Sequence, residues 1–249
     1  MKTVISLYDY TGQALKPWAS AGYQCFAYDI QHNPDFDKLE KYEGGGTISY
    51  CHADLHDPQS HRLIFKKFND HKVSFGMAFP VCTDMAVSGA SWFKKKAKAN
   101  PSFQDEAVQH AIDCAGLFED LGCPYFIENP VSVLATKWRK PDYYFHPYEF
   151  GGYIRDDEAE HPLWPDYIAP RDAYPKKTCL WTGNRFVMPT KAFVEPENGH
   201  SRQHLKLDGK SMKTKNIRSA TPRGFAMAVL LQNCLIQDLI NLHRLKAGR

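Results

Sequence analysis

The sequence predicts an α/β fold with a mostly parallel central sheet and helices on both of its faces. Apolar runs typical of buried strands alternate with helical segments over the first half of the chain. Strands that alternate with helices favour parallel pairing, with the helices covering the sheet. The length of 249 residues and the 43% apolar composition are enough for one full hydrophobic core. We therefore expect a single domain over residues 1–249.

The individual elements follow from the apolar patterning. The segment 103–121 carries apolar residues on one helical face, and the shorter segments 18–21 and 62–68 are also expected to be helical. Polar residues follow several predicted strands, at the carboxyl ends where parallel sheets bind ligands. The predicted strands are residues 2–8, 24–29, 49–54, 73–79 and 124–129.

The pattern changes after residue 129. Residues 130–217 are rich in proline and aromatic residues, which indicates an irregular substrate-recognition insertion with one strand at 177–181. Thr221 is a suitable N-cap and Pro222 a suitable first helical residue, so a closing helix is predicted over 222–245.

Composition limits the functional classes. No window approaches the roughly 20 apolar residues of a membrane helix, and the N-terminus does not have a secretory pattern. Seven scattered cysteines without a Cys-x-x-Cys pair indicate reduced thiols and a cytoplasmic protein. His52 and His56 have i,i+4 spacing but lack the helical surroundings of a zinc motif, so no metal site is expected.

The net charge of +3 is unevenly distributed. Lys94–Lys98 forms one basic patch, and Lys206–Arg223, which includes Lys210, forms another. Such patches can follow the phosphates of a nucleic acid. The alternative is that they are ordinary solvated surface.

The segment Phe79-Pro-Val-Cys82 ends a predicted strand and places a thiol among small and polar residues. The next predicted strand ends in Glu128-Asn-Pro130. Together with the remaining strand ends, these residues resemble the cytosine-5 DNA methyltransferases, and more closely the short phage-encoded branch of that family. The matching segments, in family order, are Tyr8-Asp-Tyr-Thr-Gly-Gln13, Ala21-Gly-Tyr23, Asp29, Asp54, Phe79–Cys82, Glu128–Pro130, Pro175–Trp181 and 218–232.

The resemblance implies a Rossmann-like class I S-adenosylmethionine-dependent methyltransferase fold. It also implies transfer of a methyl or related group to carbon 5 of cytosine in DNA. Carbon 5 is a poor nucleophile, so a thiolate must first add to carbon 6, which is the expected role of Cys82. Glu128 would hold a proton against N3 of the base, Asn129 would fix the loop or the exocyclic amine, and Lys177 would contact the base or a phosphate.

The same resemblance assigns binding residues. Gly12 would let the backbone approach the cofactor, S-adenosylmethionine or a modified form of it, Asp29 would accept hydrogen bonds from ribose hydroxyls, and Asp54 would bind the adenine amino group. The expected cofactor residues are Tyr8, Thr11, Gly12, Asp29, Ile30, Asp54, Leu55 and Pro80. The expected substrate residues are Ser88, Lys176, Arg218 and Arg223.

The sequence departs from the family in several places. Tyr10 stands where the family has a glycine, Pro-Val-Cys replaces Pro-Pro-Cys, and lysines replace the arginines of the basic strand. Two alternatives therefore stay open. One is the same chemistry on a free cytidine nucleotide, and the other is a catalytically silent nucleic-acid-binding protein. For a phage-encoded protein the expected location is the host cytoplasm.

Overall fold

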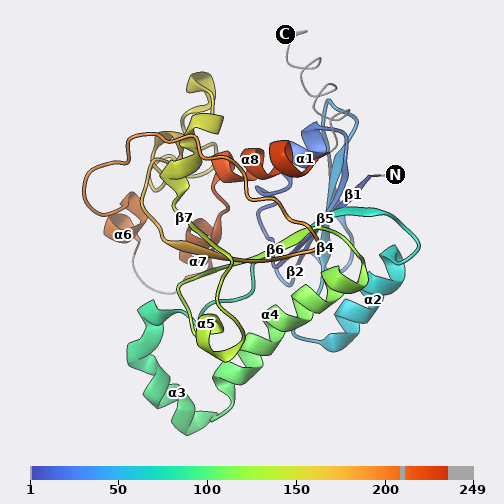
Figure 1. The fold of residues 1–249 in the computed structure, drawn as a ribbon, viewed down its shortest axis with the longest axis vertical. Helices are drawn as coiled ribbons and strands as arrows, with labels where there is room; N and C mark the ends of the chain where they lie inside the picture. Colours follow the sequence, from blue (N-terminus) through green and yellow to red (C-terminus); the bar gives the residue numbers. More distant parts are fainter. Residues whose placement is uncertain (1, 208–210, 235–249) are drawn as a thin grey trace.

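The computed structural model describes residues 2–207 and 211–234, and Figure 1 shows its ribbon. Helices and strands alternate through the first 130 residues, and shorter elements follow. In chain order the elements are β1 (Thr3–Leu7), α1 (Lys16–Ser20), β2 (Gln24–Asp29), β3 (Lys38–Lys41), β4 (Thr47–His52), α2 (Pro58–Phe68), β5 (Val73–Ala78), η1 (Val87–Trp92), α3 (Phe93–Ala99), α4 (Phe103–Asp120), β6 (Tyr125–Pro130), α5 (Leu134–Lys137), β7 (Tyr143–Phe145), η2 (Pro147–Tyr153), η3 (Asp156–Glu158), η4 (Pro170–Asp172), β8 (Thr178–Gly183), α6 (Arg202–Lys206), α7 (Met212–Ser219) and α8 (Arg223–Asn233).

One eight-stranded sheet runs through the fold in the order β3-β4-β2-β1-β5-β6-β8-β7. The strands β4, β2, β1, β5 and β6 are parallel, whereas β3 pairs antiparallel with β4 and β8 pairs antiparallel with β6 and β7. Numbered along the chain, the strands that share one direction are arranged 3-2-1-4-5-6, with β8 inserted before the last. The chain reverses its direction of travel across the sheet beside β1, and in open α/β sheets ligands bind at the carboxyl edge at such a reversal.

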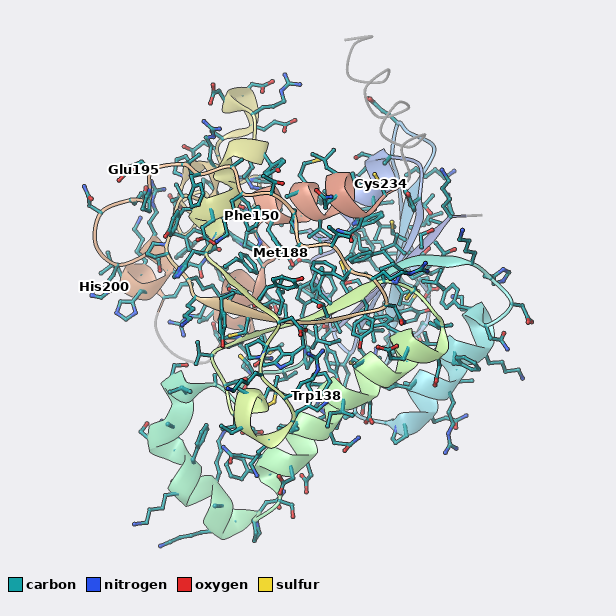
Figure 2. All side chains as sticks on the ribbon, viewed as in Figure 1. Trp138, Phe150, Met188, Glu195, His200 and Cys234 are labelled. Atoms are coloured by element: carbon teal, nitrogen blue, oxygen red, sulfur yellow. The ribbon has the colours of Figure 1, made fainter. Side chains whose placement is uncertain are left out.

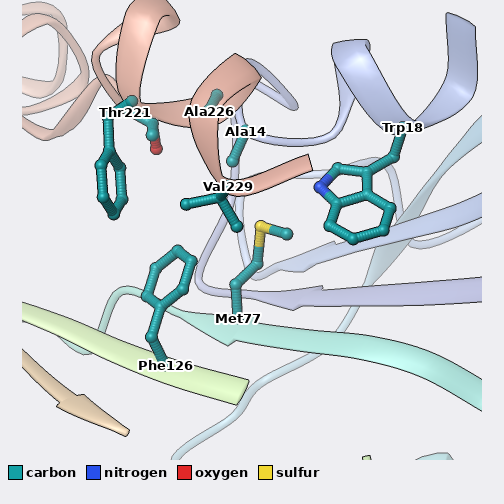
Figure 3. A pocket seen from close by; sticks show the side chains of 8 residues that line it. Ala14, Trp18, Met77, Phe126, Thr221, Ala226 and Val229 are labelled. Carbon is teal, nitrogen blue, oxygen red and sulfur yellow. The ribbon is translucent and has the colours of Figure 1, made fainter. Parts of the chain in front are cut away.

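Helices cover both faces of the sheet, as the alternating pattern predicts. On one face, Val4 of β1, Met77 of β5 and Phe126 of β6 pack against α1 and α8. Figure 3 shows Trp18 of α1 and Val229 of α8 closing over Met77 and Phe126, and no cavity large enough for a water molecule remains between them. On the other face, Ile5, Tyr125 and Ile127 pack against α2 and α4. The sheet is therefore buried between two apolar layers, which leaves its edges for function.

The mostly parallel sheet is confirmed, and the strands predicted before residue 130 lie within two residues of the observed ones at nearly every end. The strand predicted at 177–181 is observed as β8, and β7, which was not predicted, also comes from residues 130–217, so the insertion adds two strands to the sheet. The strand β3 and the helices α3, α5, α6 and α7 were not predicted. Their apolar residues are too few for a clear period, and their contacts with the rest of the chain determine their conformation.

The helix α8 begins at Arg223 and ends at Asn233, so the predicted 222–245 helix is observed in its first half and its remainder lies outside the described residues. This helix packs on η2, where Phe150 contacts Phe225 with ring centroids 5.2 Å apart. Phe150 is labelled in Figure 2. Among the described residues, no helix is long and apolar enough to cross a membrane.

Candidate active site at the carboxyl edge of the sheet

The candidate residues come together because their strands are parallel and end at the same edge. In the sheet register Leu7 lies beside both Tyr28 and Ala78, Ala78 lies beside Ile127, and Asp29 lies beside His52. The turns after β1, β2 and β4 form one half of this edge, which we call the acidic half. The segments after β5 and within the end of β6 form the other half, which we call the thiol half.

In the acidic half, the turn after β1 is built around Asp9. Its buried carboxylate accepts hydrogen bonds from Ser6 Oγ at 2.8 Å and from the Gly12 backbone N–H at 2.7 Å. Thr11 Oγ1 lies 3.4 Å from the same carboxylate. Burial raises the pKa of Asp9, and the bonds from Ser6 and Gly12 counteract that rise. Asp9 therefore holds residues 8–12 in a closed turn.

Two residues of this turn have left-handed backbone conformations. Tyr8 has φ 57° and Gly12 has φ 63°. A Cβ atom at Gly12 would lie 2.7 Å from the hydroxyl of Tyr50, so only glycine fits both the backbone angle and the space. Tyr10, which stands at the other glycine position of the family motif, is 43% exposed and stacks on His32 with ring centroids 5.6 Å apart.

Asp29 is buried at the end of β2. Its Oδ1 accepts a hydrogen bond from the Gln31 N–H at 2.8 Å, and Oδ2 has no hydrogen bond to a described residue. The following side chain, Ile30, is 58% exposed. The free oxygen of the Asp29 carboxylate can accept a hydrogen bond from a hydroxyl group of a ligand. The exposed Ile30 side chain beside it can pack against a flat apolar group of the same ligand.

The turn after β4 completes the acidic half. Leu55 is buried, and its carbonyl oxygen accepts a hydrogen bond from the Tyr8 hydroxyl at 3.0 Å. Asp54 is exposed, and its carboxylate accepts from the His56 N–H at 3.0 Å. The Tyr8 hydrogen bond thus joins the turn after β1 to the turn after β4. The Asp54 carboxylate remains exposed to solvent.

In the thiol half, Cys82 lies in a turn that follows the end of β5. The Cys82 carbonyl accepts hydrogen bonds from the N–H groups of Met85 and Ala86, at 3.0 and 2.8 Å. The thiol is half-buried. The turn continues into a β-bridge between Ala86 and Ser132, which holds the Cys82 segment beside the segment that follows β6.

Asn129 and Glu128 approach Cys82 from the end of β6. Asn129 is buried, and its Nδ2 donates to the Pro80 carbonyl at 2.9 Å, which fixes the start of the Cys82 turn. The Asn129 Oδ1 atom is buried without a hydrogen-bond partner among the described residues. Glu128 is half-buried, and its carboxylate makes no hydrogen bond with a described residue. Both side chains thus keep polar atoms available for another molecule.

The electrostatics couple Cys82 to Glu128. Burial raises the pKa of the Cys82 thiol, the Glu128 carboxylate raises it further, and Lys176 and Lys215 partly oppose that rise. Burial also raises the pKa of Glu128, again opposed by Lys176. Because each anion disfavours the other, the two groups together bind protons as an interacting pair. A proton on Glu128 therefore makes the Cys82 thiolate easier to form.

The two lysines before β8 point in different directions. Lys176 is the cation that acts on both Cys82 and Glu128, and its Nζ donates to the Arg218 carbonyl at 2.8 Å. Lys177, which the family resemblance places in the catalytic role, is exposed and lies 4.8 Å from the centre of the Tyr144 ring. Successive side chains of an extended segment face opposite ways, so only one of the pair faces the thiol.

Arg223 does not fit the substrate-binding role predicted for it. Its guanidinium donates to the Asp172 carboxylate through Nε at 3.2 Å and through one terminal nitrogen at 2.9 Å. The same group also donates to the carbonyls of Glu158, Ala159 and Glu160 at 2.8 to 2.9 Å. These bonds use the five donors of an arginine, so none is left for a phosphate.

The other predicted substrate residues lie at the surface. Arg218 is exposed, and one terminal nitrogen donates to the Leu207 carbonyl at 2.8 Å. Ser88 is exposed in η1. Within the described part of the basic patch 206–223, Lys215 of α7 is the lysine whose charge acts on Cys82, and Lys210 lies outside the described residues.

Three features of the site were not assigned from the sequence. The Asp-x-x-Gly spacing of Asp9 and Gly12 is typical of a side chain that closes a turn and was available as a signal. Gln31 and Asn216 exchange amide hydrogen bonds of 3.2 and 3.4 Å, which ties α7 to the end of β2. The effect of Lys215 on Cys82 depends on this docking of α7, and no local pattern indicates it.

No group of three His, Cys, Asp or Glu side chains that could hold a metal ion occurs within residues 2–207 and 211–234.

No family model matches the chain, and no curated protein matches it. Among solved structures, one similar chain is a candidate DNA modification methyltransferase encoded within a prophage of E. coli. The identity is 14% and the TM-score 0.41, with 84% of this chain and 49% of that chain covered. This chain thus spans about half the length of that protein. The similarity is too low to inform function, which has to be inferred from the site itself.

Proposed function

We propose that the protein is an S-adenosylmethionine-dependent methyltransferase that modifies carbon 5 of cytosine in DNA through a covalent cysteine adduct. The observation that carries this proposal is the meeting of Cys82, Glu128 and Asn129 beside Lys176. A thiol, a carboxyl group with a raised pKa and a cation are the groups that nucleophilic addition to a pyrimidine ring requires.

The acidic half fits the cofactor. The strand order 3-2-1-4-5-6 is that of sheets that bind nucleotides at the edge beside the first strand. The unpaired Asp29 oxygen suits a ribose hydroxyl, the exposed Ile30 offers apolar surface to an adenine ring, and Asp54 can accept from its amino group. Leu55 is buried, and its carbonyl oxygen holds the turn beside this surface through Tyr8. Gly12 keeps the turn after β1 free of a side chain, Thr11 adds a hydroxyl, and Pro80, whose carbonyl is held by Asn129, would border the cofactor from the thiol half. Bound S-adenosylmethionine would supply an electrophilic methyl group.

In the proposed reaction the Cys82 thiolate adds to carbon 6 of the base, forming a carbon–sulfur bond. Glu128 donates its proton to N3, which neutralises the charge that the addition places on the ring. Carbon 5 then becomes nucleophilic and accepts the methyl group. The proton on carbon 5 passes to a water molecule of the solvent, the bond between carbon 6 and the Cys82 sulfur breaks to restore the thiolate, and N3 returns its proton to Glu128.

The coupling between the two acids serves this sequence of events. While Glu128 carries the proton that N3 needs, the Cys82 thiol loses the neighbouring negative charge that raises its pKa. The protonation state that activates the nucleophile is thus the same state that activates the base. Lys176 favours the anions of both residues and stands where the family has a basic strand.

DNA is the substrate that we favour over a free nucleotide. A mononucleotide enzyme needs a compact phosphate pocket, and the guanidinium of Arg223, one of the groups predicted for it, is fully used within the protein. In a duplex the target cytosine has to leave the base stack, because both faces of carbon 6 are covered there. The alternative of a catalytically silent nucleic-acid-binding protein depends on Tyr10, which replaces a glycine of the family motif. The Tyr10 ring stacks on His32.

The decisive experiment uses DNA containing 5-fluorocytosine together with S-adenosylmethionine, because after methyl transfer fluorine cannot leave carbon 5 as a cation and the cysteine adduct should accumulate. We expect a stable protein–DNA adduct with the parent protein and none with Cys82→Ala, which should also lose at least about 10⁴-fold in methyl transfer. Cys234→Ala removes another half-buried thiol and serves as the matched control. Methyl transfer by Cys82→Ala at the parental rate would refute the covalent mechanism.

A further inference from the structure

Residues Val87–Ala99, comprising η1 and α3, form a projecting arm that the proposed reaction does not use. The arm lies at the periphery of the ribbon, away from the sheet (Figure 1). None of its residues is buried. Two of its side chains contact the body: Phe93, whose ring centroid lies 5.8 Å from that of Phe103, and Lys96, which pairs with Asp84.

The other face of α3 carries an uncompensated charge. Lys94, Lys95 and Lys98 are exposed, and none of them forms an ion pair with a described residue. Residues 85–104 contain neither aspartate nor glutamate. Positions 94, 95 and 98 share one side of a helix, whereas positions 93 and 96 lie toward the other. The arm thus has one side attached to the body and one side that presents three positive charges.

The base of the arm is fixed next to the thiol. The arm begins at Val87, five residues after Cys82, and the Val87 N–H donates to the Val131 carbonyl at 3.0 Å. Ala86 forms the β-bridge to Ser132, just beyond the end of β6. Trp92, at the junction of η1 and α3, is 50% exposed. A molecule that reaches Cys82 with one of its bases therefore brings its neighbouring segments close to the arm.

We propose that the lysine face of α3 binds the phosphate backbone of duplex DNA beside the target base. This proposal rests on the proposed function, since it assigns the flanking substrate to the same site. Lysine ammonium groups attract phosphates without base specificity, and such contacts set the position of a protein on DNA. A membrane surface fits less well, because the exposed side of α3 is charged and, of the two aromatic side chains at its start, Trp92 is exposed whereas Phe93 packs toward Phe103.

The test compares two variants that lose the same charge. Lys94, Lys95 and Lys98 are changed together to glutamine in one variant, and Lys41, Lys66 and Lys72 in the other. The control lysines are exposed, and Lys41 and Lys72 lie near the amino ends of the strands, opposite the site. Binding to a 20-base-pair duplex is measured by fluorescence anisotropy at increasing salt, without cofactor. S-adenosylmethionine binding and thermal unfolding verify that each variant is folded.

Each phosphate contact contributes about 0.9 to the slope of log affinity against log salt. Three lost contacts should reduce the slope by about 2.7 units, so the loss of affinity between 50 and 200 mM salt should be roughly 40-fold smaller for the arm variant than for the parent. The control variant should keep the parental slope.

An unchanged slope in the arm variant, or an equal loss in both variants, would overturn the proposal. Tighter binding of the parent to anionic phospholipid vesicles than to DNA, lost in the arm variant, would overturn it in favour of a membrane role. Loss of slope in the arm variant alone, with no methyl transfer by the parent, would support the arm and refute the proposed function.

Discussion

The two halves of the carboxyl edge are built in different ways. In the acidic half, polar groups are satisfied locally: Asp9 is bonded by Ser6 and Gly12, each three residues away, and Asp29 by Gln31, two residues away. In the thiol half, Asn129 holds Pro80 across 49 residues, and Lys176 is attached to the Arg218 carbonyl across 42. These two carboxylates of the acidic half are thus held by their own turns, which the Tyr8–Leu55 bond then joins across 47 residues, whereas the Asn129 and Lys176 bonds of the thiol half connect distant segments.

The halves also differ in what they leave unsatisfied. In the acidic half, Asp29 Oδ2 lacks a hydrogen-bond partner among the described residues. In the thiol half, the Glu128 carboxylate and the Asn129 side-chain oxygen both lack one, and burial also raises the pKa values of Glu128 and Cys82. Unsatisfied buried groups reduce stability, and they persist where a bound molecule uses them. The comparison indicates that the acidic half is organised for binding and the thiol half for chemistry. The following predictions test that division, from the largest expected effect to the smallest.

Glu128→Gln should separate activity from stability. Loss of the proton donor should reduce methyl transfer by roughly 10² to 10⁴-fold. A carboxyl group whose pKa is raised on folding contributes most to stability below its unfolded pKa, and that contribution is lost as the pH rises through the folded pKa. The variant should therefore unfold at a higher temperature than the parent at pH 8 and at about the same temperature at pH 4. A variant that unfolds at a lower temperature than the parent at pH 8 would contradict the conclusion that ionised Glu128 destabilises the thiol half.

Asp29→Ala should act on binding alone. Removing a carboxylate that accepts from the cofactor ribose is expected to weaken S-adenosylmethionine binding by roughly 10 to 100-fold in calorimetric titration. Affinity for duplex DNA should not change. Asp35→Ala, which removes an exposed carboxylate from the same loop, is the control. Equal affinity of the Asp29 variant and the parent would remove the acidic half from the cofactor site.

Gly12→Ala tests how firmly the acidic half is fixed. The left-handed backbone and the approach of the new Cβ to Tyr50 should destabilise the fold by about 2 kcal/mol. Gly116→Ala is the matched control, because Gly116 lies within α4 with no atom near its would-be Cβ, and it should gain about 0.5 to 1 kcal/mol. Urea denaturation measures both. Equal effects of the two changes would mean that the turn can rearrange.

The two neighbouring lysines sharpen the description of the thiol half. Lys176→Gln should lower methyl transfer by up to about fivefold, since the cation acts on Cys82 through partly screened charge, and Lys177→Gln should have little effect. The pH at which Cys82 is alkylated should rise only in the Lys176 variant. The reverse ranking would restore the role that the family resemblance gives to Lys177.

The difference between the halves also explains what could be predicted from the sequence. The strands before residue 130 carry strong local patterns, and the order of polar residues at their ends follows from parallel pairing, so the candidate set around Asp29, Cys82 and Glu128 could be named in advance. The face that Lys176 or Lys177 presents depends on the register of β8 against β6, and that register is determined by contacts between distant segments.

Arg223 also shows that contacts between distant segments cannot be predicted from local sequence. An arginine in a basic stretch is a reasonable phosphate ligand, and nothing nearby in the sequence indicates that Asp172 and three carbonyl groups already bind it. The helix α7 was missed for a related reason, because its position depends on the Gln31–Asn216 pair formed across 185 residues. Local patterns thus locate the edge of the sheet, and long-range contacts decide which side chains face into it.

The hydrogen bonds of Arg223 have a consequence for the order in which the chain can fold. They span 51 to 65 residues and join Glu158–Glu160 and Asp172 to the first residue of α8. During synthesis, residues 158–172 emerge well before residue 223, so this part of the molecule cannot close until nearly all of the described chain has left the ribosome. The parallel strands β1 to β6 can pair earlier. Nascent chains stalled before and after residue 223 should therefore differ sharply in how easily proteases cut residues 150–175, although both already contain every strand of the sheet.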